Sequence, residues 1–141
     1  MRQTTVFAGQ TKQLGQSIGK KLRPGQVLAL AGDLGSGKTT FVQGLAAGLG
    51  IRHKIKSPTF VIFIAYPIPK SRLVFYHFDL YRLRRPSDLR DLGFAEIINN
   101  MNHITAVEWP KQAKPLLPPH TKWIYFKHDP RNPNNRILAS S

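Results

Sequence analysis

The sequence predicts an α/β fold in which a mixed β-sheet is flanked by helices. Two observations support this prediction: short apolar runs with strand character recur along the chain, and a glycine-rich turn leads from one of them into an amphipathic helix. With 141 residues, the chain has the length of one domain with a sizeable core. We therefore expect a single domain over residues 1–141, with a loosely ordered end at the Pro- and Asn-rich residues 129–136.

The first strand and helix follow from the apolar pattern. Residues 26–32 (QVLALAG) form an apolar run that has no helical period and ends in glycine, which indicates a buried strand. In the next run the apolar residues recur at spacings of three and four: Phe41, Leu45, Ala46 and Leu49. This spacing predicts a helix that begins at Lys38 and ends at Gly50.

The remaining elements are predicted in the same way. Two β-branched and aromatic runs, residues 58–66 and 72–81, flank the turn sequence PIPKS and predict a hairpin. Residues 86–100 have a helical pattern, with Ser87 as the expected N-cap. Two further apolar runs, HITAVEW and TKWIYFKH, predict strands near the end of the chain.

The net charge is the unusual feature of the composition. The chain has 21 Lys and Arg residues against 7 Asp and Glu residues, a formal net charge of +14. An excess of this size indicates a polyanionic partner or substrate, because solubility alone needs much less charge. The basic residues form small clusters such as GKKLR, RHKIK and YRLRR, and any one of these is also typical of a solvated face.

Neither cysteine chemistry nor a membrane span is indicated. The chain contains no Cys, which excludes disulfides and thiol redox chemistry. The first ten residues lack the apolar stretch of a secretory signal, and the longest apolar run is far shorter than the roughly 18 residues of a membrane span. We expect a soluble, cytoplasmic protein with no membrane partner.

Residues 32–40 (GDLGSGKTT) match the phosphate-binding pattern GxxxxGK[ST] between a predicted strand and a predicted helix. Glycines in such a loop let successive N–H groups point at phosphate oxygens, and the helix adds its positive dipole end. Lys38 is the cation for the outer phosphates, the Thr39 hydroxyl is a ligand for Mg²⁺, and Thr40 donates to an inner phosphate. The sequence therefore predicts a P-loop NTPase-like domain.

Carboxylates and a hydroxyl complete the predicted site. Asp79 and Glu108 come where apolar strands end, the position at which phosphoryl-transfer sites of this kind collect acidic residues. In KSPTF, Pro58 forces Ser57 into an extended conformation, and Thr59 presents a hydroxyl that could sense the outer phosphate. We predict that these side chains lie beside the phosphate-binding loop.

Five motifs in order closely resemble the TsaE family: GDLGSGKTTFVQGLAAGLG, KSPTF, YHFDLYRL, DLGFAEII and VEWP. TsaE is the bacterial P-loop ATPase of tRNA threonylcarbamoyladenosine biosynthesis. The resemblance implies an ATPase that uses Mg²⁺, has low activity alone, and works with the TsaB–TsaD heterodimer. In that system TsaD transfers a threonylcarbamoyl group to the adenosine beside the tRNA anticodon. The basic surface then becomes a candidate contact for tRNA.

The resemblance also implies a role for each matching residue. It assigns the ATP phosphates to Gly35, Ser36, Gly37, Lys38, Thr39 and Thr40. It assigns Mg²⁺ to Thr39 and Glu108, a switch role to Thr59, and a metal-linked or water-orienting role to Asp79. The implied catalytic residues are Lys38, Thr59, Asp79 and Glu108.

Three further nucleotide contacts are implied by position. Trp109 matches the tryptophan of the family's EW pair, and it is equally well explained as a packed aromatic at a strand end. Gln13 and Asn132 fall about where the family contacts the nucleotide base. We include all three among the expected ATP-binding residues.

Other function classes fit the sequence less completely. A GTPase would need an Asn-Lys-x-Asp guanine reader, which the chain lacks. A small P-loop kinase needs an Arg-bearing lid, which RRPSDLRD could loosely supply, and it stays as the alternative. A pure RNA-binding module would explain the charge and leave the phosphate-binding loop and both carboxylates unexplained.

Overall fold

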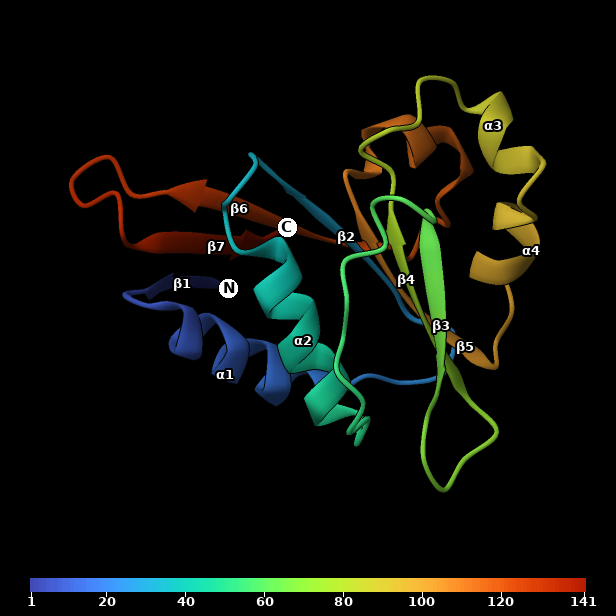
Figure 1. The fold of residues 1–141 in the computed structure, drawn as a ribbon, viewed down its shortest axis with the longest axis horizontal. Coiled ribbons are helices and arrows are strands. Elements are labelled where there is room, and N and C mark those ends of the chain that lie inside the picture. Colours follow the sequence, from blue (N-terminus) through green and yellow to red (C-terminus); the bar gives the residue numbers. More distant parts are fainter.

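Seven strands form one mixed β-sheet in the computed structural model, which describes residues 1–141. The strands lie in the order β1-β7-β6-β2-β5-β4-β3, and helices flank the sheet (Figure 1). This arrangement confirms the predicted α/β fold of a P-loop NTPase-like domain. In chain order the elements are β1 (Arg2–Thr5), α1 (Ala8–Gly19), β2 (Val27–Gly32), α2 (Lys38–Gly48), β3 (Phe63–Pro67), β4 (Val74–Asp79), α3 (Ser87–Arg90), α4 (Phe94–Ile98), β5 (His103–Glu108), the 3₁₀ helix η1 (Pro110–Leu116), β6 (Lys122–His128) and β7 (Arg136–Ser140).

The four central strands are parallel, and the edges of the sheet are antiparallel. β2 pairs in parallel with both β5 and β6, and β5 pairs in parallel with β4. β3 forms the predicted hairpin with β4, while β7 pairs antiparallel with β6 and β1 with β7. Because the central strands are parallel, the carboxyl ends of β2, β4 and β5 meet at one edge of the sheet.

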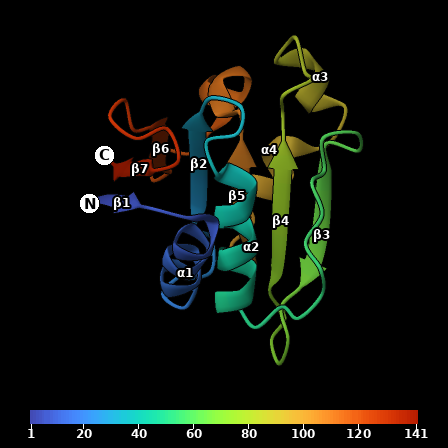
Figure 2. The same cartoon turned by 60° about the vertical axis from the view of Figure 1, so that its left-hand side comes forward.

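The two faces of the sheet pack against two separate hydrophobic clusters. Leu28 and Leu30 of β2 pack in one cluster with Phe41 of α2. Val27, one position earlier in the strand, packs in the other cluster with Phe94 of α4. Successive side chains of a strand point to opposite faces. Helices α1 and α2 therefore cover one face, and α3, α4 and η1 cover the other (Figure 2).

Helices α1 and α2 contact each other through glycines on both helices: Gly15, Gly19, Gly44 and Gly48. A Cβ atom on Gly44 would lie 2.1 Å from the carbonyl oxygen of Lys12, and one on Gly15 would lie 2.3 Å from that of Phe41. No side chain fits at these distances, so the two backbones touch directly. This contact brings the beginning of α1 beside the loop that precedes α2.

Two of the predicted elements have different bounds in the structure. The helix predicted over residues 86–100 is divided into α3 and α4, because Gly93 between them has a left-handed φ of 70°. Pro86 is the N-cap of α3 and no side chain caps the helix, so the prediction for Ser87 is wrong. The strand predicted over residues 58–66 begins only at β3, since the preceding residues form a turn in which Ile62 has a φ of 74°.

The last residues of the chain, which follow the Pro- and Asn-rich segment, are part of the sheet. β7 pairs with both β6 and β1, with Arg2 opposite Ala139. The Pro- and Asn-rich segment connects β6 to β7, and the Asp129 amide donates to the Asn135 carbonyl across it at 3.2 Å. β1, α1, η1 and β7 were not predicted from the sequence. No helix in the structure combines the length and the apolar character that crossing a membrane requires.

Candidate active site

The loop between β2 and α2 presents free backbone N–H groups. Gly35 and Gly37 have left-handed φ angles of 75° and 100°, which let successive N–H groups converge on an anion. The N–H groups of residues 37–40 donate no hydrogen bond within the chain, and they lie at the positive end of the α2 dipole. Ser36 is fully buried with an unpartnered hydroxyl. The loop therefore fits a phosphate group.

Lys38 is held inside the site. Its side chain is buried, its ammonium donates to the Gly32 carbonyl, and the nitrogen lies 3.4 Å from the centroid of the Trp109 ring. Burial lowers the pKa of the Lys38 amino group from its ordinary value, and the carboxylates of Glu108 and Asp79 act in the opposite direction. The nearby carboxylates favour a charged ammonium, and phosphate oxygens would favour it further.

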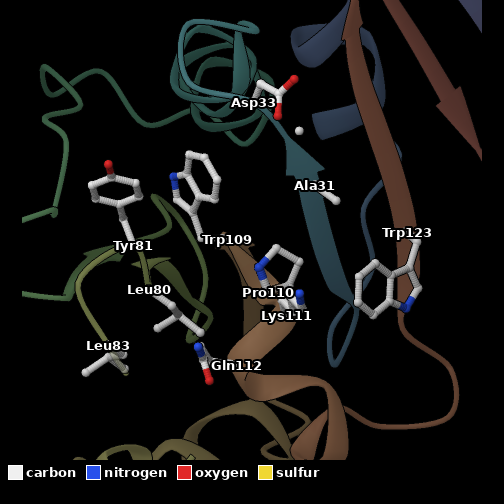
Figure 3. A pocket seen from close by; sticks show the side chains of 11 residues that line it. Ala31, Asp33, Leu80, Tyr81, Leu83, Trp109, Pro110, Lys111, Gln112 and Trp123 are labelled. Atoms are coloured by element: carbon white, nitrogen blue, oxygen red, sulfur yellow. The ribbon is translucent and has the colours of Figure 1, made fainter. Parts of the chain in front are cut away.

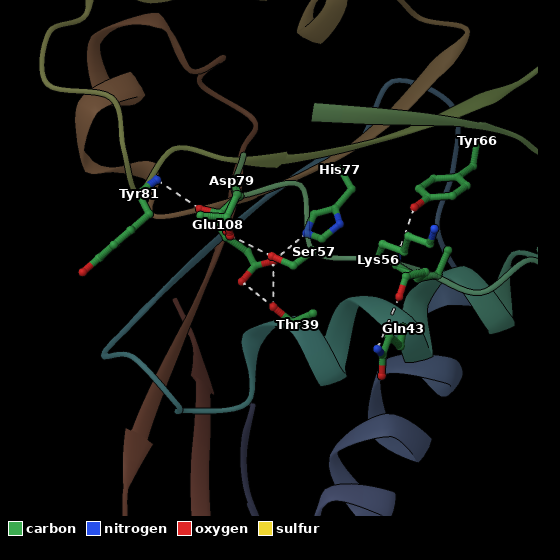
Figure 4. Close-up of polar contacts among 11 residues, drawn as sticks. Thr39, Gln43, Lys56, Ser57, Tyr66, His77, Asp79, Tyr81 and Glu108 are labelled. Carbon is green, nitrogen blue, oxygen red and sulfur yellow. Dashed lines mark hydrogen bonds and ion pairs between the residues drawn. The ribbon is translucent and has the colours of Figure 1, made fainter. Parts of the chain in front are cut away.

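The ends of β4 and β5 bring two buried carboxylates together. Asp79, the last residue of β4, lies opposite Glu108, the last residue of the neighbouring strand β5, so the two predicted strand ends meet. The Thr39 hydroxyl lies 3.1 and 3.2 Å from the two carboxylate oxygens of Glu108, and His77 Nε2 lies 2.5 Å from Glu108 Oε2 (Figure 4). Glu108 is therefore fixed from two sides, by the first turn of α2 and by β4.

The Thr39–Glu108 pair has the donor chemistry that suits Mg²⁺. A hydroxyl and a carboxylate supply hard oxygen ligands, which Mg²⁺ prefers. No group of three or more His, Cys, Asp or Glu side chains is placed to hold a metal ion by itself. Mg²⁺ commonly takes one or two protein ligands and completes its coordination with phosphate oxygens and water. These two residues fit a metal that binds together with a nucleotide.

Asp79 connects the predicted switch loop to the sheet. Its Oδ2 accepts a hydrogen bond of 2.7 Å from the Thr59 hydroxyl, and its Oδ1 accepts one of 3.0 Å from the Tyr81 amide. The hydroxyls of Ser57 and Thr59 are also hydrogen-bonded, at 2.7 Å. Thr59 and Asp79 were predicted as site residues from separate motifs, and the structure joins them directly.

Trp109 lies between two cavities at this edge of the sheet. It has a left-handed φ of 55°, and its ring centroid is 4.9 Å from that of Tyr81. On one side Trp109 lines the phosphate-loop cavity, of about 280 Å³. On the other it lines a cavity of about 340 Å³ that Trp123 also reaches (Figure 3). The indole thus forms a wall of the site and covers Lys38.

Most of the predicted site residues line the 280 Å³ cavity together: Gly35, Ser36, Gly37, Lys38, Thr39, Thr40, Thr59, Asp79, Glu108 and Trp109. Gln13 and Asn132 do not line it. Gln13 is exposed on α1, and Asn132 is exposed in the β6–β7 connection.

Sequence reasoning missed several residues of the site. His77 stands two positions before Asp79 in β4, and this period-two spacing puts both on the same strand face, which could have identified it. A smaller cavity of about 130 Å³ lies on the other side of Gly35 and Gly37, lined also by Phe7, Ala8, Thr11, Thr40, Asn134 and Arg136. Apart from Thr40, no local pattern marks these residues, because α1 and β7 reach the loop only through the tertiary fold.

Comparisons with known proteins show the family to which the chain belongs. The family model described as "Threonylcarbamoyl adenosine biosynthesis protein TsaE" matches residues 7–137. The tRNA threonylcarbamoyladenosine biosynthesis protein TsaE of Treponema pallidum is 39% identical over 127 residues, covering 90% of this chain and 91% of the relative. The protein of the same name in Bacillus subtilis is 39% identical over 123 residues, covering 87% of this chain and 75% of the relative.

A solved structure is also similar to this chain. The crystal structure of Bacillus subtilis YdiB superposes with a TM-score of 0.76 at 32% sequence identity, covering 98% of this chain and 82% of that one. The structural match and the family model thus both cover almost the whole of this chain. The chain belongs to the TsaE family of tRNA threonylcarbamoyladenosine biosynthesis proteins.

Proposed function

We propose that this chain is a P-loop ATPase that binds ATP with Mg²⁺ and hydrolyses it. The observation that carries the proposal is the meeting of three features at one edge of the sheet: the free N–H groups of residues 37–40, the Lys38 ammonium, and the Thr39–Glu108 pair. Phosphoryl transfer needs a cradle for phosphate oxygens, a cation and ligands for a metal, and these features supply them.

Each residue has a distinct role in this proposal. The N–H groups of the loop bind the phosphate oxygens, and Lys38 neutralises charge on the outer phosphate. Thr39 and Glu108 hold Mg²⁺, which supplies electrostatic stabilisation of the phosphate charge when bound. Asp79 orients the attacking water and, through its hydrogen bond to Thr59, links that water to the switch loop. Trp109 excludes bulk water from this side of the site.

The site that we propose for the nucleotide base lies close in sequence to Gln13 and Asn132. Gln13 and Asn132 remain exposed, and their near neighbours Thr11 and Asn134 line the 130 Å³ cavity beside Gly37. We place the base in this cavity. The Arg136 guanidinium donates to the Gly35 carbonyl at 3.2 Å, which ties β7 to the loop there.

We further propose that ATP hydrolysis drives the cycle that adds a threonylcarbamoyl group to the adenosine next to the tRNA anticodon. In this proposal the chain acts in the cytoplasm with the TsaB–TsaD heterodimer, and its own activity is low. Family membership supports the pathway. The net charge of +14 supports a position near tRNA in that assembly.

The test is a hydrolysis assay of the purified chain, alone and with the two partner proteins. A slow rate that rises in the complex, and that Lys38→Ala abolishes, would support the proposal. A Lys38→Ala variant with ordinary hydrolysis would overturn the assignment of the loop. Phosphate transfer to a small acceptor without partners would instead favour the alternative, a small P-loop kinase.

A further inference from the structure

The positive charge of the chain is left unpaired by the fold. None of the 21 Lys and Arg side chains lies within 4 Å of a carboxylate oxygen, and the only acid–base contact is that between His77 and Glu108. Surface charges in a folded domain are ordinarily mixed in sign. The unpaired basic side chains therefore leave a strong positive field on the surface.

The positive charge is least offset by carboxylates in the first part of the chain, which includes the helical layer of α1 and α2. Asp33 is the only acidic residue among residues 1–78, which contain eleven Lys and Arg residues. Neither α1, nor α2, nor the connection from α2 to β3 carries a carboxylate. By contrast, the basic residues Arg84 and Arg85 are followed at once by Asp88 and Asp91 around α3.

Within this layer the structure contains a groove of about 750 Å³. It lies between α1, the second half of α2 and the chain that follows α2, and it is lined by Lys12, Gln43, Ala47, Gly50, Ile51, Arg52, His53, Lys54 and Ile55. We call it the basic groove. Lys12, Arg52, His53 and Lys54 are exposed, and no acidic residue lines it. The Gln43 amide donates to the Ile55 carbonyl at 3.5 Å and holds the two walls together (Figure 4).

Compensation of the α2 dipole explains only part of this arrangement. Basic residues after a helix C-terminus are favourable, and Arg52 and Lys54 follow the end of α2. Lys12 belongs to the first half of α1, away from any helix C-terminus, and still faces the same groove. Cations from two separate elements that converge on one open space indicate an anionic ligand.

The lining of the groove distinguishes between two classes of polyanion. Protein interfaces are enriched in aromatic anchors and depleted in Lys, and bases of single-stranded RNA stack on aromatic rings. The groove has two Lys residues and no Phe, Tyr or Trp. Lys and Arg with an amide, and without Phe, Tyr or Trp, match the sugar-phosphate backbone, which is contacted without base readout.

We propose that the basic groove binds the phosphate backbone of duplex RNA. That this RNA is a tRNA rests on the proposed function. None of the groove residues lines the phosphate-loop cavity, so RNA binding and ATP binding are separable by mutation. The wall formed by Arg52 and Lys54 continues along the chain to Thr59, which keeps the two sites on one segment.

The experiment titrates a labelled, unmodified tRNA transcript with the full chain across a salt series. The double variant Arg52→Glu/Lys54→Glu should bind the transcript at least about tenfold more weakly, and the slope of log affinity against log salt should fall by about 2, because two phosphate contacts are lost. The matched control is Arg84→Glu/Arg85→Glu, which changes net charge equally and should have the smaller effect. Circular dichroism and binding of a fluorescent ATP analogue should stay unchanged in both variants.

Three results would overturn the proposal. Equal losses in both double variants would mean that diffuse charge binds the RNA. Absence of binding by the wild-type chain at low salt would remove the RNA site altogether. Loss of binding to the TsaB–TsaD proteins in the groove variant, with tRNA binding unchanged, would make the groove a protein-docking surface. If the chain binds tRNA in a salt-sensitive way but does not hydrolyse ATP, the proposed function would be contradicted, while the RNA-binding role of the basic groove would remain supported.

Discussion

His77 Nε2 lies 2.5 Å from Glu108 Oε2, inside the sheet and across 31 residues of sequence. The imidazole is fully buried, and its other nitrogen has no hydrogen-bond partner. The same carboxylate accepts the Thr39 hydroxyl, so His77 fixes the orientation in which Glu108 faces the first turn of α2. If Glu108 binds Mg²⁺ as proposed, His77 is a positioning residue, and such residues ordinarily tune metal affinity.

His77→Ala is therefore expected to weaken Mg²⁺ use. Loss of an orienting partner typically costs about 10- to 100-fold in metal affinity. The Mg²⁺ concentration for half-maximal hydrolysis should rise by at least about tenfold, while nucleotide binding in EDTA stays unchanged. His77→Asn should restore part of the Mg²⁺ affinity by donating a hydrogen bond to Glu108. Equal weakening of nucleotide binding with and without Mg²⁺ would contradict this role and indicate a packing defect.

Substitutions at the two carboxylates are expected to have different effects. Glu108→Ala removes one of the two proposed protein ligands for Mg²⁺, so it should abolish the dependence of nucleotide affinity on Mg²⁺ and spare binding in EDTA. The measurement is a nucleotide titration with and without Mg²⁺, monitored by a fluorescent ATP analogue. Mg²⁺-dependent binding like that of the wild type would contradict the assignment.

Asp79→Asn is expected to keep ATP binding and lose turnover. The amide retains an acceptor for Thr59 but cannot orient and polarise water as a carboxylate does, and such a change costs about 100-fold or more. Thr59→Val is the companion variant, because it removes the hydrogen bonds of the Thr59 hydroxyl to Asp79 and Ser57 and leaves the Asp79 carboxylate in place. Single-turnover hydrolysis with saturating ATP measures both variants. Mild and equal effects of the Asp79 and Glu108 substitutions would refute the separation of their roles.

Lys38→Met is expected to stabilise the free chain while it abolishes ATP binding. Burial lowers the pKa of the Lys38 amino group, which means that the charged form is less favourable in the folded chain than in the unfolded chain. The charged Lys38 ammonium therefore destabilises the folded chain by its full amount below the folded-state pKa of Lys38. This destabilisation disappears above the unfolded-state pKa of about 10.5. The Met variant should melt at a higher temperature at pH 7, and the gain should shrink toward pH 10.5.

The control for this prediction is Lys20→Met, at an exposed position after α1. This variant should change the melting temperature little at either pH, because its charge is already solvated. Thermal unfolding monitored by circular dichroism at both pH values provides the comparison. A lower melting temperature for Lys38→Met at pH 7 would show that the carboxylates around the ammonium outweigh its burial.

Gly44→Ala is expected to destabilise the fold although alanine favours helices. The added Cβ would lie 2.1 Å from the Lys12 carbonyl oxygen, so α1 and α2 must separate, at a cost of about 3 kcal/mol. Gly9→Ala is the matched control, since its Cβ meets only the exposed ring of Phe7. Urea unfolding should show a loss for the first variant and little change or a gain for the second. Similar midpoints for both variants would contradict the close backbone contact.

Local sequence patterns were enough to predict the parts of the molecule that depend on neighbouring residues. The phosphate-binding loop follows from glycines, Lys38 and Thr39 at fixed spacing, because its conformation and the N-terminus of α2 are local properties. The strand ends at Asp79 and Glu108 were also predictable, since apolar runs mark where parallel strands finish. These local patterns were enough to predict the fold class and most of the residues that line the site.

Which of these residues contact one another depends on the packing of the whole chain. The His77–Glu108 contact depends on the parallel register of β4 and β5, and the hydrogen bond between Thr59 and Asp79 depends on how a loop folds back onto the sheet. The edge strand β7 is held by pairing with β6 and with β1, at the other end of the chain, and the basic groove needs α1 against α2. Contacts between residues far apart in sequence form only when the whole core packs, because each costs chain entropy that no local interaction offsets.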